Sequence, residues 1–220
     1  MDELCLSQWC GWQKHGEDRP DTPQLLPSDG PGKSLPAMLR RRLDDAGRAT
    51  CDILASLDSG AELPLLHASR HGDATRTLAM LHDLIAGEAL SPTRFSLSVH
   101  NATLGIHSIS QQHQRPLQAL SACGNEFDAL LSEARGYLAE GYPAVVIAFT
   151  EGDIPKEYQG HTEHPGKACA IGMRLSLNEG HKLVAGASGN SLPRPTPIDI
   201  IEWLCGSGKT PIGRHGWTLA

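Results

Sequence analysis

The sequence predicts an α/β fold in a single domain. Residues 117–121 read as a short apolar strand, residues 125–139 have helical periodicity, and PAVVIAF at 143–149 is an apolar, β-branched strand. A strand, a helix and a strand within about 30 residues form a βαβ unit, which predicts a parallel pair with a right-handed crossover. Residues 168–177 and 182–187 surround the turn NEGH and predict a terminal β-hairpin.

The first half of the chain adds further helices and one strand. Residues 13–36 are dense in Pro, Gly, Asp and Ser, which predicts a long loop. Helical spacing of apolar residues predicts helices over 36–57, 73–86 and 98–110, and the run LPLLHA predicts a strand at 63–68. A chain of 220 residues can bury one substantial core, so these elements are expected to share it.

Two of these helices have a defined apolar face. In the helix over 73–86, which Gly87 is placed to end, the side chains expected to point inward are Leu78, Leu81, Leu84 and Ile85. In the helix over 125–139 the shared face consists of Phe127, Leu130, Leu131, Ala134 and Leu138. A last short helix, IDIIEWLC, follows a proline-rich loop.

Composition excludes several classes of protein. The net charge of −6 argues against a sequence-independent nucleic-acid binder, and no stretch approaches the roughly 18–20 apolar residues of a membrane span. The acidic N-terminus has no secretory pattern, and the six cysteines have no short paired spacing, so a cytoplasmic protein with reduced thiols is expected. The RRR run at 40–42 predicts a solvated helix face, which could also meet an acidic carrier protein.

Three residues in the segment 161–169 raise the question of a metal site. His161 and His164 precede Cys169 and could supply nitrogen and sulfur ligands. The segment is rich in Gly and Pro and has no second ligand pair at a standard spacing. Solvated loop histidines are therefore the expectation, with no metal and no cofactor.

Cys123 is the candidate catalytic residue. It stands in the turn between a predicted strand and a predicted helix, where the helix dipole and free N–H groups lower the pKa of a thiol. Its small neighbours Ser121, Ala122 and Gly124 would let a substrate approach the sulfur. The alternative is a buried cysteine that packs as a small hydrophobe.

Other motifs have simpler interpretations. SRHGD at 69–73 suggests a catalytic His with Asp, but a turn in which Asp73 caps the next helix explains the same residues. Asn101 can be a helix cap or a buried hydrogen-bonding group. CGSGKT at 205–210 lacks the first glycine of a phosphate-binding loop, whose place is held by Trp203, so that function is rejected.

The order of motifs resembles a known family. LPAMLRRRL, then LLHASRHGDATRTLAMLHDLIAGEALSPTRFSLSVHNATLGIHSI, then RPLQALSACGNEFDALLSEARGYLAEGYPAVVIAFTE are similar to the ketoacyl-synthase-like N-terminal domain, over roughly residues 35–187. This family comprises short stand-alone relatives of the β-ketoacyl synthases, often encoded with aryl-polyene or xanthomonadin-type pathways. Ser121-Ala122-Cys123 matches the turn that carries the acyl-accepting cysteine of condensing enzymes.

The resemblance implies a thiolase-like half: three layers, a mostly parallel mixed sheet, and a central helix after Cys123. Condensing enzymes also carry two histidines and a lysine in a second half, and residues up to 220 contain nothing similar. Without them decarboxylation lacks its oxyanion donors. A lone thiol gains little without a general base.

Three functions follow as hypotheses. The first is an accessory protein of a fatty-acid or polyketide-type pathway that binds an acyl chain, an acyl carrier protein or a ketoacyl synthase subunit. The second is an acyltransferase that uses Cys123 as nucleophile, and the third is a structural dimerisation module. The expected organisation is an N-terminal segment at 1–35 and a ketoacyl-synthase-like domain at 36–220, with a homodimer or a mixed pair formed near the central helix.

Overall fold

The computed structural model describes residues 4–16, 20–60, 62–186, 191–206 and 208–220. Their strands are β1 (Leu4–Gln13), β2 (Leu65–Ala68), β3 (Leu117–Leu120), β4 (Val145–Glu151), β5 (Cys169–Ser176), β6 (His181–Ala185) and β7 (Trp217–Leu219). Their helices are α1 (Ala37–Arg40), α2 (Asp45–Leu57), α3 (Ala74–Ile85), α4 (Pro92–Ser96), α5 (Ala102–Gln111), α6 (Glu126–Ala139), α7 (Lys156–Gln159) and α8 (Pro197–Cys205).

The described strands form one mixed sheet in the order β3-β2-β4-β5-β1-β6-β7. Strands β3, β2 and β4 are mutually parallel, and β5 runs antiparallel to both β4 and β1. The predicted parallel relation of β3 and β4 is confirmed, but β2 lies between them. The crossover therefore skips one strand.

The predicted terminal hairpin is wrong. Strands β5 and β6 do not pair with each other, because β1 lies between them and pairs with both. The turn before β6 passes so close to β1 that a Cβ on Gly180 would lie 2.1 Å from the Leu6 carbonyl oxygen. The sequence analysis predicted no strand in residues 4–13, although they form the longest strand described.

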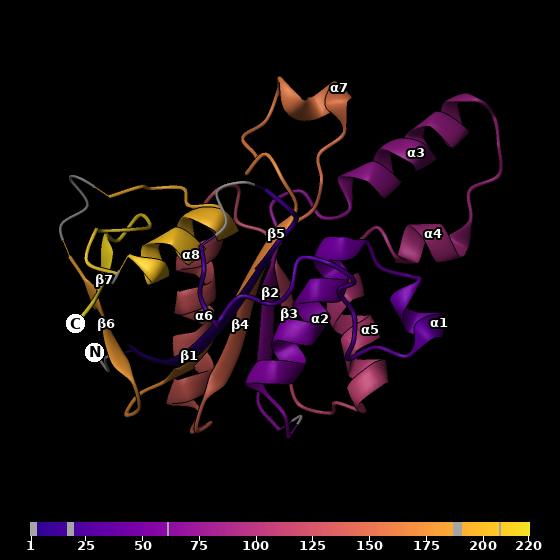
Figure 1. Cartoon of the computed structure of the whole chain (residues 1–220). Coiled ribbons are helices and arrows are strands. Elements are labelled where there is room, and N and C mark those ends of the chain that lie inside the picture. The colour runs from indigo at the N-terminus through magenta and orange to yellow at the C-terminus, as the bar shows by residue number, and fades with distance from the viewer. Residues whose placement is uncertain (1–3, 17–19, 61, 187–190, 207) are drawn as a thin grey trace.

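Helices cover both faces of the sheet, which gives the three layers expected of a thiolase-like half (Figure 1). On one face α6 and α8 pack against the side chains of Ile147, Phe149 and Met173. On the other face α2 and α5 pack against Val146 and Ala148. Each of the fully buried Leu side chains of α6 contributes about 1.5–3 kcal/mol to folding.

The predicted helix over 36–57 divides in two. Helix α1 ends at Arg40, and α2 starts after Asp44, whose side chain accepts the Gly47 N–H at 2.7 Å. An aspartate N-cap satisfies a free donor of the new helix, so the chain bends there. Arg41 and Arg42 are exposed as predicted, but they lie in the turn between the two helices and not on a helix face.

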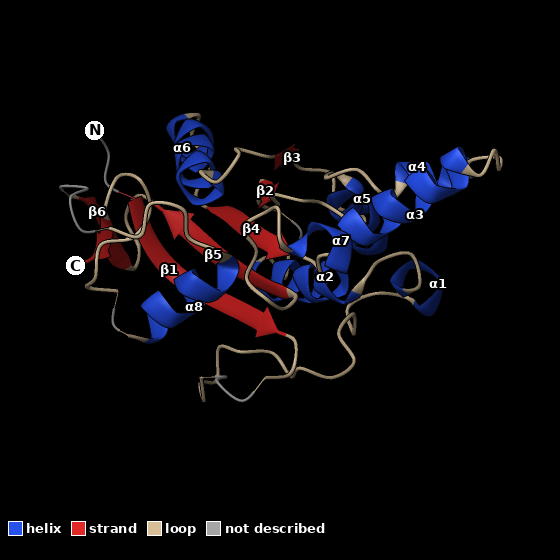
Figure 2. Ribbon diagram, turned by 90° about the horizontal axis from the view of Figure 1, so that it is seen from above, coloured by secondary structure: helices blue, strands red, loops and turns tan. Residues whose placement is uncertain are grey.

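Helices α3 and α4 project from the body (Figures 1 and 2). The prediction that the apolar face of α3 points inward is wrong: Leu81, Leu84 and Ile85 are 43%, 59% and 84% exposed. Met80 is the buried residue of this helix. Amphipathic spacing identified the helix correctly but could not show whether its apolar face meets this chain.

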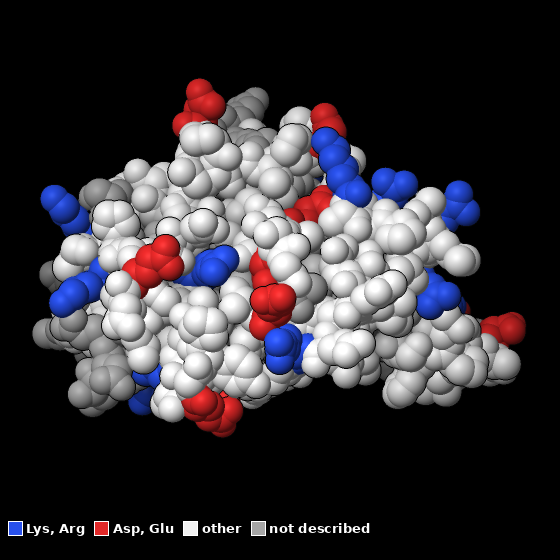
Figure 3. Space-filling model, turned by 90° about the horizontal axis from the view of Figure 1, so that it is seen from below, with Lys and Arg blue, Asp and Glu red and all other residues white. Residues whose placement is uncertain are grey.

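The described surface carries charges of both signs. Seen from below, acidic and basic side chains lie scattered among uncharged ones (Figure 3). No helix formed by the described residues is long and apolar enough to cross a membrane. All six cysteines are free thiols, and four of them are buried.

Candidate functional site

Cys123 lies on a sharp turn between β3 and α6, with its side chain exposed. Its φ of 49° is in the left-handed region, which few residues other than glycine adopt, and Gly124 follows with a φ of 102°. This turn has the strand-to-helix geometry of a nucleophile elbow. Such a strained backbone conformation persists only where surrounding contacts stabilise it.

Glu126 is the residue that holds this turn. Its Oε1 accepts the N–H groups of Gly124 at 2.9 Å and Ala122 at 3.2 Å, and its side chain is fully buried. These two N–H groups belong to the turn that precedes α6, and Glu126 is their hydrogen-bond partner. The negative charge at the positive end of α6 is therefore supplied by the chain itself.

Arg70 neutralises Glu126. It follows β2, whose carboxyl end lies beside that of β3, and its Nε and Nη2 donate to Glu126 Oε2 at 3.2 and 3.1 Å. Its Nη1 lies 3.7 Å from Oε2 of Glu163, which is also 3.8 Å from Arg194. Arg194 in turn lies against Gly124, so the charged cluster surrounds the cysteine turn.

Glu151 ends β4 at the same edge of the sheet. Its Oε1 accepts the Arg70 N–H at 2.6 Å, whereas its buried Oε2 has no hydrogen-bond partner among the described residues. Burial raises the pKa of Glu151 to about 7, and the nearby Glu126 carboxylate adds to this rise. Glu151 is thus largely protonated in mildly acidic solution.

The second carboxylate behaves in the opposite way. Burial would raise the pKa of Glu126, but the N–H groups of the turn and the Arg70 guanidinium outweigh it and hold this pKa below its ordinary value. Two neighbouring carboxylates therefore differ in charge near neutral pH. Glu126 is ionised because it has donors on both oxygens, and Glu151 has an oxygen without any.

Ser69 and His100 form a pair beside this cluster. Ser69 Oγ lies 2.6 Å from His100 Nδ1, and Ser69 is buried. Burial lowers the pKa of His100, although Glu126 opposes this. The cavity beside the pair has a volume of about 40 Å³, which leaves room for little more than water. The hydrogen bond between Ser69 and His100 is therefore assigned a structural role.

The other predicted positions have local roles. Asp73 caps α3 by accepting the Arg76 N–H at 2.8 Å, which confirms the turn interpretation of residues 69–73. Asn101 stands at the start of α5, but its side chain makes no capping hydrogen bond. Cys169 is buried in β5, and the described residues contain no group of three or more metal-ligating side chains.

The chemistry available to Cys123 is limited. In the part of the chain that the structure describes, no histidine or carboxylate hydrogen-bonds to its thiol, and the N–H groups of Ala122 and Gly124 already bind Glu126. Nucleophilic catalysis needs a base, and acyl transfer needs donors for an oxyanion. The arrangement presents an exposed thiol that has no hydrogen-bonded base among the described residues, and two of the N–H groups beside it are already engaged.

Sequence reasoning found Cys123 and missed the charged residues around it. Arg70 and Glu151 each follow or end a parallel strand, and Glu126 stands three residues after the cysteine, at the first position of a helix. That last spacing was a usable signal, because an acidic residue in the first helical turn can bend back to free N–H groups. The strand order that brings these three residues together could not be predicted from the sequence.

Comparison with known proteins identifies the family. The profile described as Beta-ketoacyl synthase, N-terminal domain, matches residues 9–196, a wider span than the predicted 35–187 because it adds the second half of β1, the segment up to residue 34 and residues 188–196. No curated protein matches the sequence.

Solved structures share the fold. A chain of the complex of the ketosynthase ApeO with its chain length factor ApeC from Xenorhabdus doucetiae is 24% identical, with a TM-score of 0.79, over 98% of this chain and 99% of that chain. A chain of the ishigamide ketosynthase/chain length factor is 10% identical, with a TM-score of 0.63, over 83% and 66%.

A β-ketoacyl synthase from Burkholderia phymatum STM815 is 11% identical to this protein, with a TM-score of 0.59, over 92% of this chain and 68% of that chain. At such identities the likeness shows the thiolase-like ketosynthase fold. Because the family profile covers most of the sequence, this ketosynthase-like protein belongs to the β-ketoacyl synthase N-terminal domain family.

Proposed function

We propose that the protein is an accessory, ketosynthase-like subunit that pairs with a full-length ketosynthase and has little condensing activity itself. Its pathway would be of the fatty-acid or polyketide type, such as aryl-polyene synthesis. The matched chain in the complex of a ketosynthase with its chain length factor has almost the same extent as this chain, which supports a short partner subunit.

The observation that carries the proposal is the apolar face of α3 and α4, which has no partner in the described structure. Leu84, Ile85 and Phe95 are 59%, 84% and 61% exposed. Apolar side chains gathered on a projecting element usually mark a protein–protein contact. The face therefore favours a second chain over a monomeric enzyme.

The open edge of β3 supports the same pairing. This four-residue strand bonds to β2 on one side and is the last strand of the sheet on the other. An outer strand with a free edge is a template for pairing with another chain. It also precedes Cys123 directly, so a partner there would adjoin the cysteine turn.

The charge around Cys123 supports low condensing activity. Glu126 occupies two N–H groups of the turn, and no base among the described residues hydrogen-bonds to the thiol. An acyl carrier protein is a second proposed partner, because Arg41 and Arg42 are exposed in the turn between α1 and α2. Carrier proteins of this kind are expected to be acidic.

Co-purification with the full-length ketosynthases of the organism that makes this protein tests the pairing. The double variant Leu84→Asp, Ile85→Asp should weaken binding at least 10-fold, because two charges would enter an apolar contact. Leu192→Asp, at a side chain 45% exposed elsewhere, is the matched control and should bind normally. Absence of binding by the unaltered protein up to about 100 μM would contradict the proposal.

A further inference from the structure

A cavity of about 680 Å³ lies along the part of β1 that β6 does not pair with, remote from Cys123. Its size is within the range of ligand sites. Strands β2, β4 and β5 separate β1 from β3, so this cavity and the pairing surface above are distinct. The apolar lining consists of Leu6, Trp9, Leu57, Leu204 and Leu219.

The cavity exists because β1 is paired on one side only over part of its length. Strand β6 pairs with β1 from Leu4 to Leu6, and the segment at 24–26 takes over at Gly11. Between these points the described residues place no strand beside this edge. A gap of four residues, Ser7 to Cys10, is thereby left in the sheet.

Backbone groups of Trp9 point into this gap. Gly11 directs its N–H to the Gln24 carbonyl oxygen and accepts the Leu26 N–H, so its polar groups face away from β5. The register of β1 on β5 is regular from Gln8 onward, and alternate residues of a strand direct their hydrogen bonds the same way. The N–H and C=O of Trp9 therefore have no partner among the described residues and can pair with an incoming chain.

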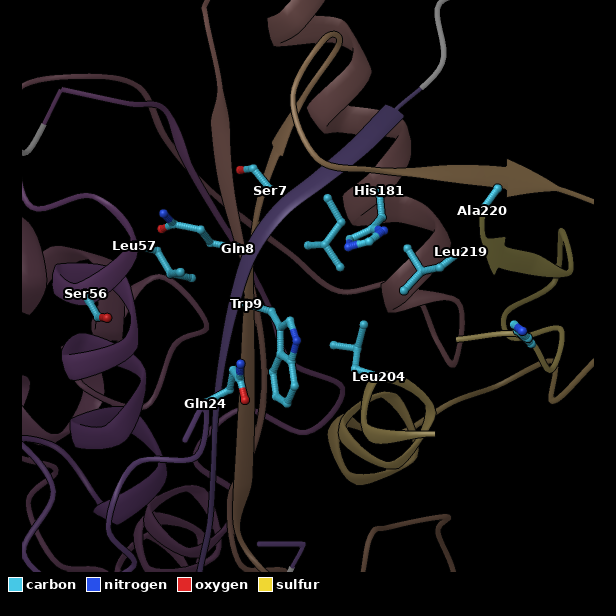
Figure 4. Close-up of a pocket in the computed structure, with 12 residues that line it drawn as sticks. Ser7, Gln8, Trp9, Gln24, Ser56, Leu57, His181, Leu204, Leu219 and Ala220 are labelled. Atoms are coloured by element: carbon cyan, nitrogen blue, oxygen red, sulfur yellow. The ribbon is translucent and has the colours of Figure 1, made fainter. Parts of the chain in front are cut away.

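The cavity opens on both faces of the sheet. Figure 4 shows Trp9 and Leu204 on one side of β1, with Gln8, Ser56 and Leu57 on the other. Successive side chains of an added strand would enter these two regions in turn. A simple acyl chain would follow one region and leave the Trp9 backbone groups unpaired, so the geometry favours a peptide.

The charged residues that line the cavity indicate which peptide sequence would fit. Lys209 and His181 line the cavity, both exposed, and none of the lining residues has an acidic side chain. The Lys209 ammonium group has no ion pair with any described residue. An acidic side chain at one end of the peptide would complement it.

We propose that the β1 edge binds an extended segment of a partner protein as an added strand, with apolar residues at alternate positions and an acidic residue opposite Lys209. The segment would complete the hydrogen bonding of Trp9, place its apolar side chains in the region beside Trp9 and Leu204, and turn its polar side chains toward Gln8 and Ser56. This mode of recognition uses backbone bonds for affinity and side-chain pockets for specificity.

The heptapeptide Glu-Val-Thr-Leu-Thr-Val-Glu, with carboxyfluorescein on its N-terminal amine and an amide at its C-terminus, tests this with the full chain by fluorescence anisotropy. N-methylation at alternate residues should weaken binding at least 10-fold, since it removes strand hydrogen bonds. Lys209→Glu should weaken it several-fold and favour the same peptide with lysine in place of glutamate. Lys156→Glu, an exposed lysine on α7, is the matched control and should change nothing.

Three results would overturn the proposal. One is no anisotropy change up to about 1 mM peptide, and another is equal affinity for the N-methylated form. The third is a different occupant: decanoate that displaces the peptide would assign the cavity to an acyl chain. Self-association in sedimentation that Lys209→Glu abolishes would likewise assign it to a second copy.

Discussion

Arg70 and Glu126 form an ion pair with almost no solvent access next to the turn that carries Cys123. Arg70 Nη2 lies 3.1 Å from Glu126 Oε2, and their side chains are 11% and 0% exposed. The other oxygen of Glu126 binds N–H groups on both sides of Cys123. One carboxylate therefore fixes the shape of the turn and joins it to the end of β2.

Glu126→Gln should lower the free energy of unfolding by about 3 kcal/mol. The amide keeps an acceptor for the turn but leaves the Arg70 guanidinium buried without its main counter-charge. Urea unfolding followed by circular dichroism measures the change. The control is Glu133→Gln on the same helix, whose exposed side chain bonds to Gln118 and should cost less than about 0.5 kcal/mol. Equal losses in both variants would contradict the assigned role.

The raised pKa of Glu151 should make the stability of the protein depend on pH. Its pKa in the folded protein is about 7, above the ordinary 4.5, so the folded state holds this proton more tightly than the unfolded chain. The resulting stability is fully present below about pH 4.5 and is lost as the pH rises to 7. The glutamine of Glu151→Gln does not titrate. Between pH 5 and pH 8 the free energy of unfolding of this variant should therefore rise, relative to that of the unaltered protein, by on the order of 2–3 kcal/mol. Urea unfolding at several pH values measures this difference. A difference in the free energy of unfolding that stays constant over this range would refute the raised pKa of Glu151.

Elements were easier to predict than their partners. The helix over 125–139 was placed within one residue of α6, and its apolar face is buried as expected, because helical periodicity is a local signal. Strand order is not local. Strand β1 inserts between β5 and β6 through contacts between residues more than 150 positions apart, which no short-range pattern records.

The same distinction limited the site. Cys123 was visible from its turn, whereas the charged residues around it meet only because three parallel strands end at one edge of the sheet. The face of α3 shows the other limit. Its apolar spacing says that the face prefers burial, and exposed Leu84 and Ile85 show that this chain does not provide it.

Thiol labelling separates the exposed cysteines from the packed ones. Iodoacetamide at pH 8 should modify Cys123 and Cys205 in the folded protein, and the remaining four after unfolding. Intact mass before and after adding urea counts the modified thiols, and Cys123→Ala should remove one. An inert Cys123 would favour the packing alternative.

The acyltransferase alternative has its own test in the same turn. Incubation with acyl-carrier thioesters should give no stable acyl adduct, because the described site provides neither a base at the thiol nor free donors at Ala122 and Gly124. Intact mass over several chain lengths measures it. An adduct that disappears in Cys123→Ala would establish an acyl-accepting thiol and reverse the proposal of an accessory subunit.

Two substitutions of glycine by alanine should change the free energy of unfolding in opposite directions. A Cβ on Gly172 in β5 would lie 2.3 Å from Ile53 Cγ2 and 2.9 Å from Leu57 Cδ1, so Gly172→Ala must displace α2 and should cost about 1–3 kcal/mol. A Cβ on Gly136 in α6 meets nothing within 4 Å, so Gly136→Ala should add about 0.5–1 kcal/mol by improving helix propensity. Urea midpoints at constant slope measure both. Stabilisation by Gly172→Ala would mean that α2 does not pack on β5 as closely as described.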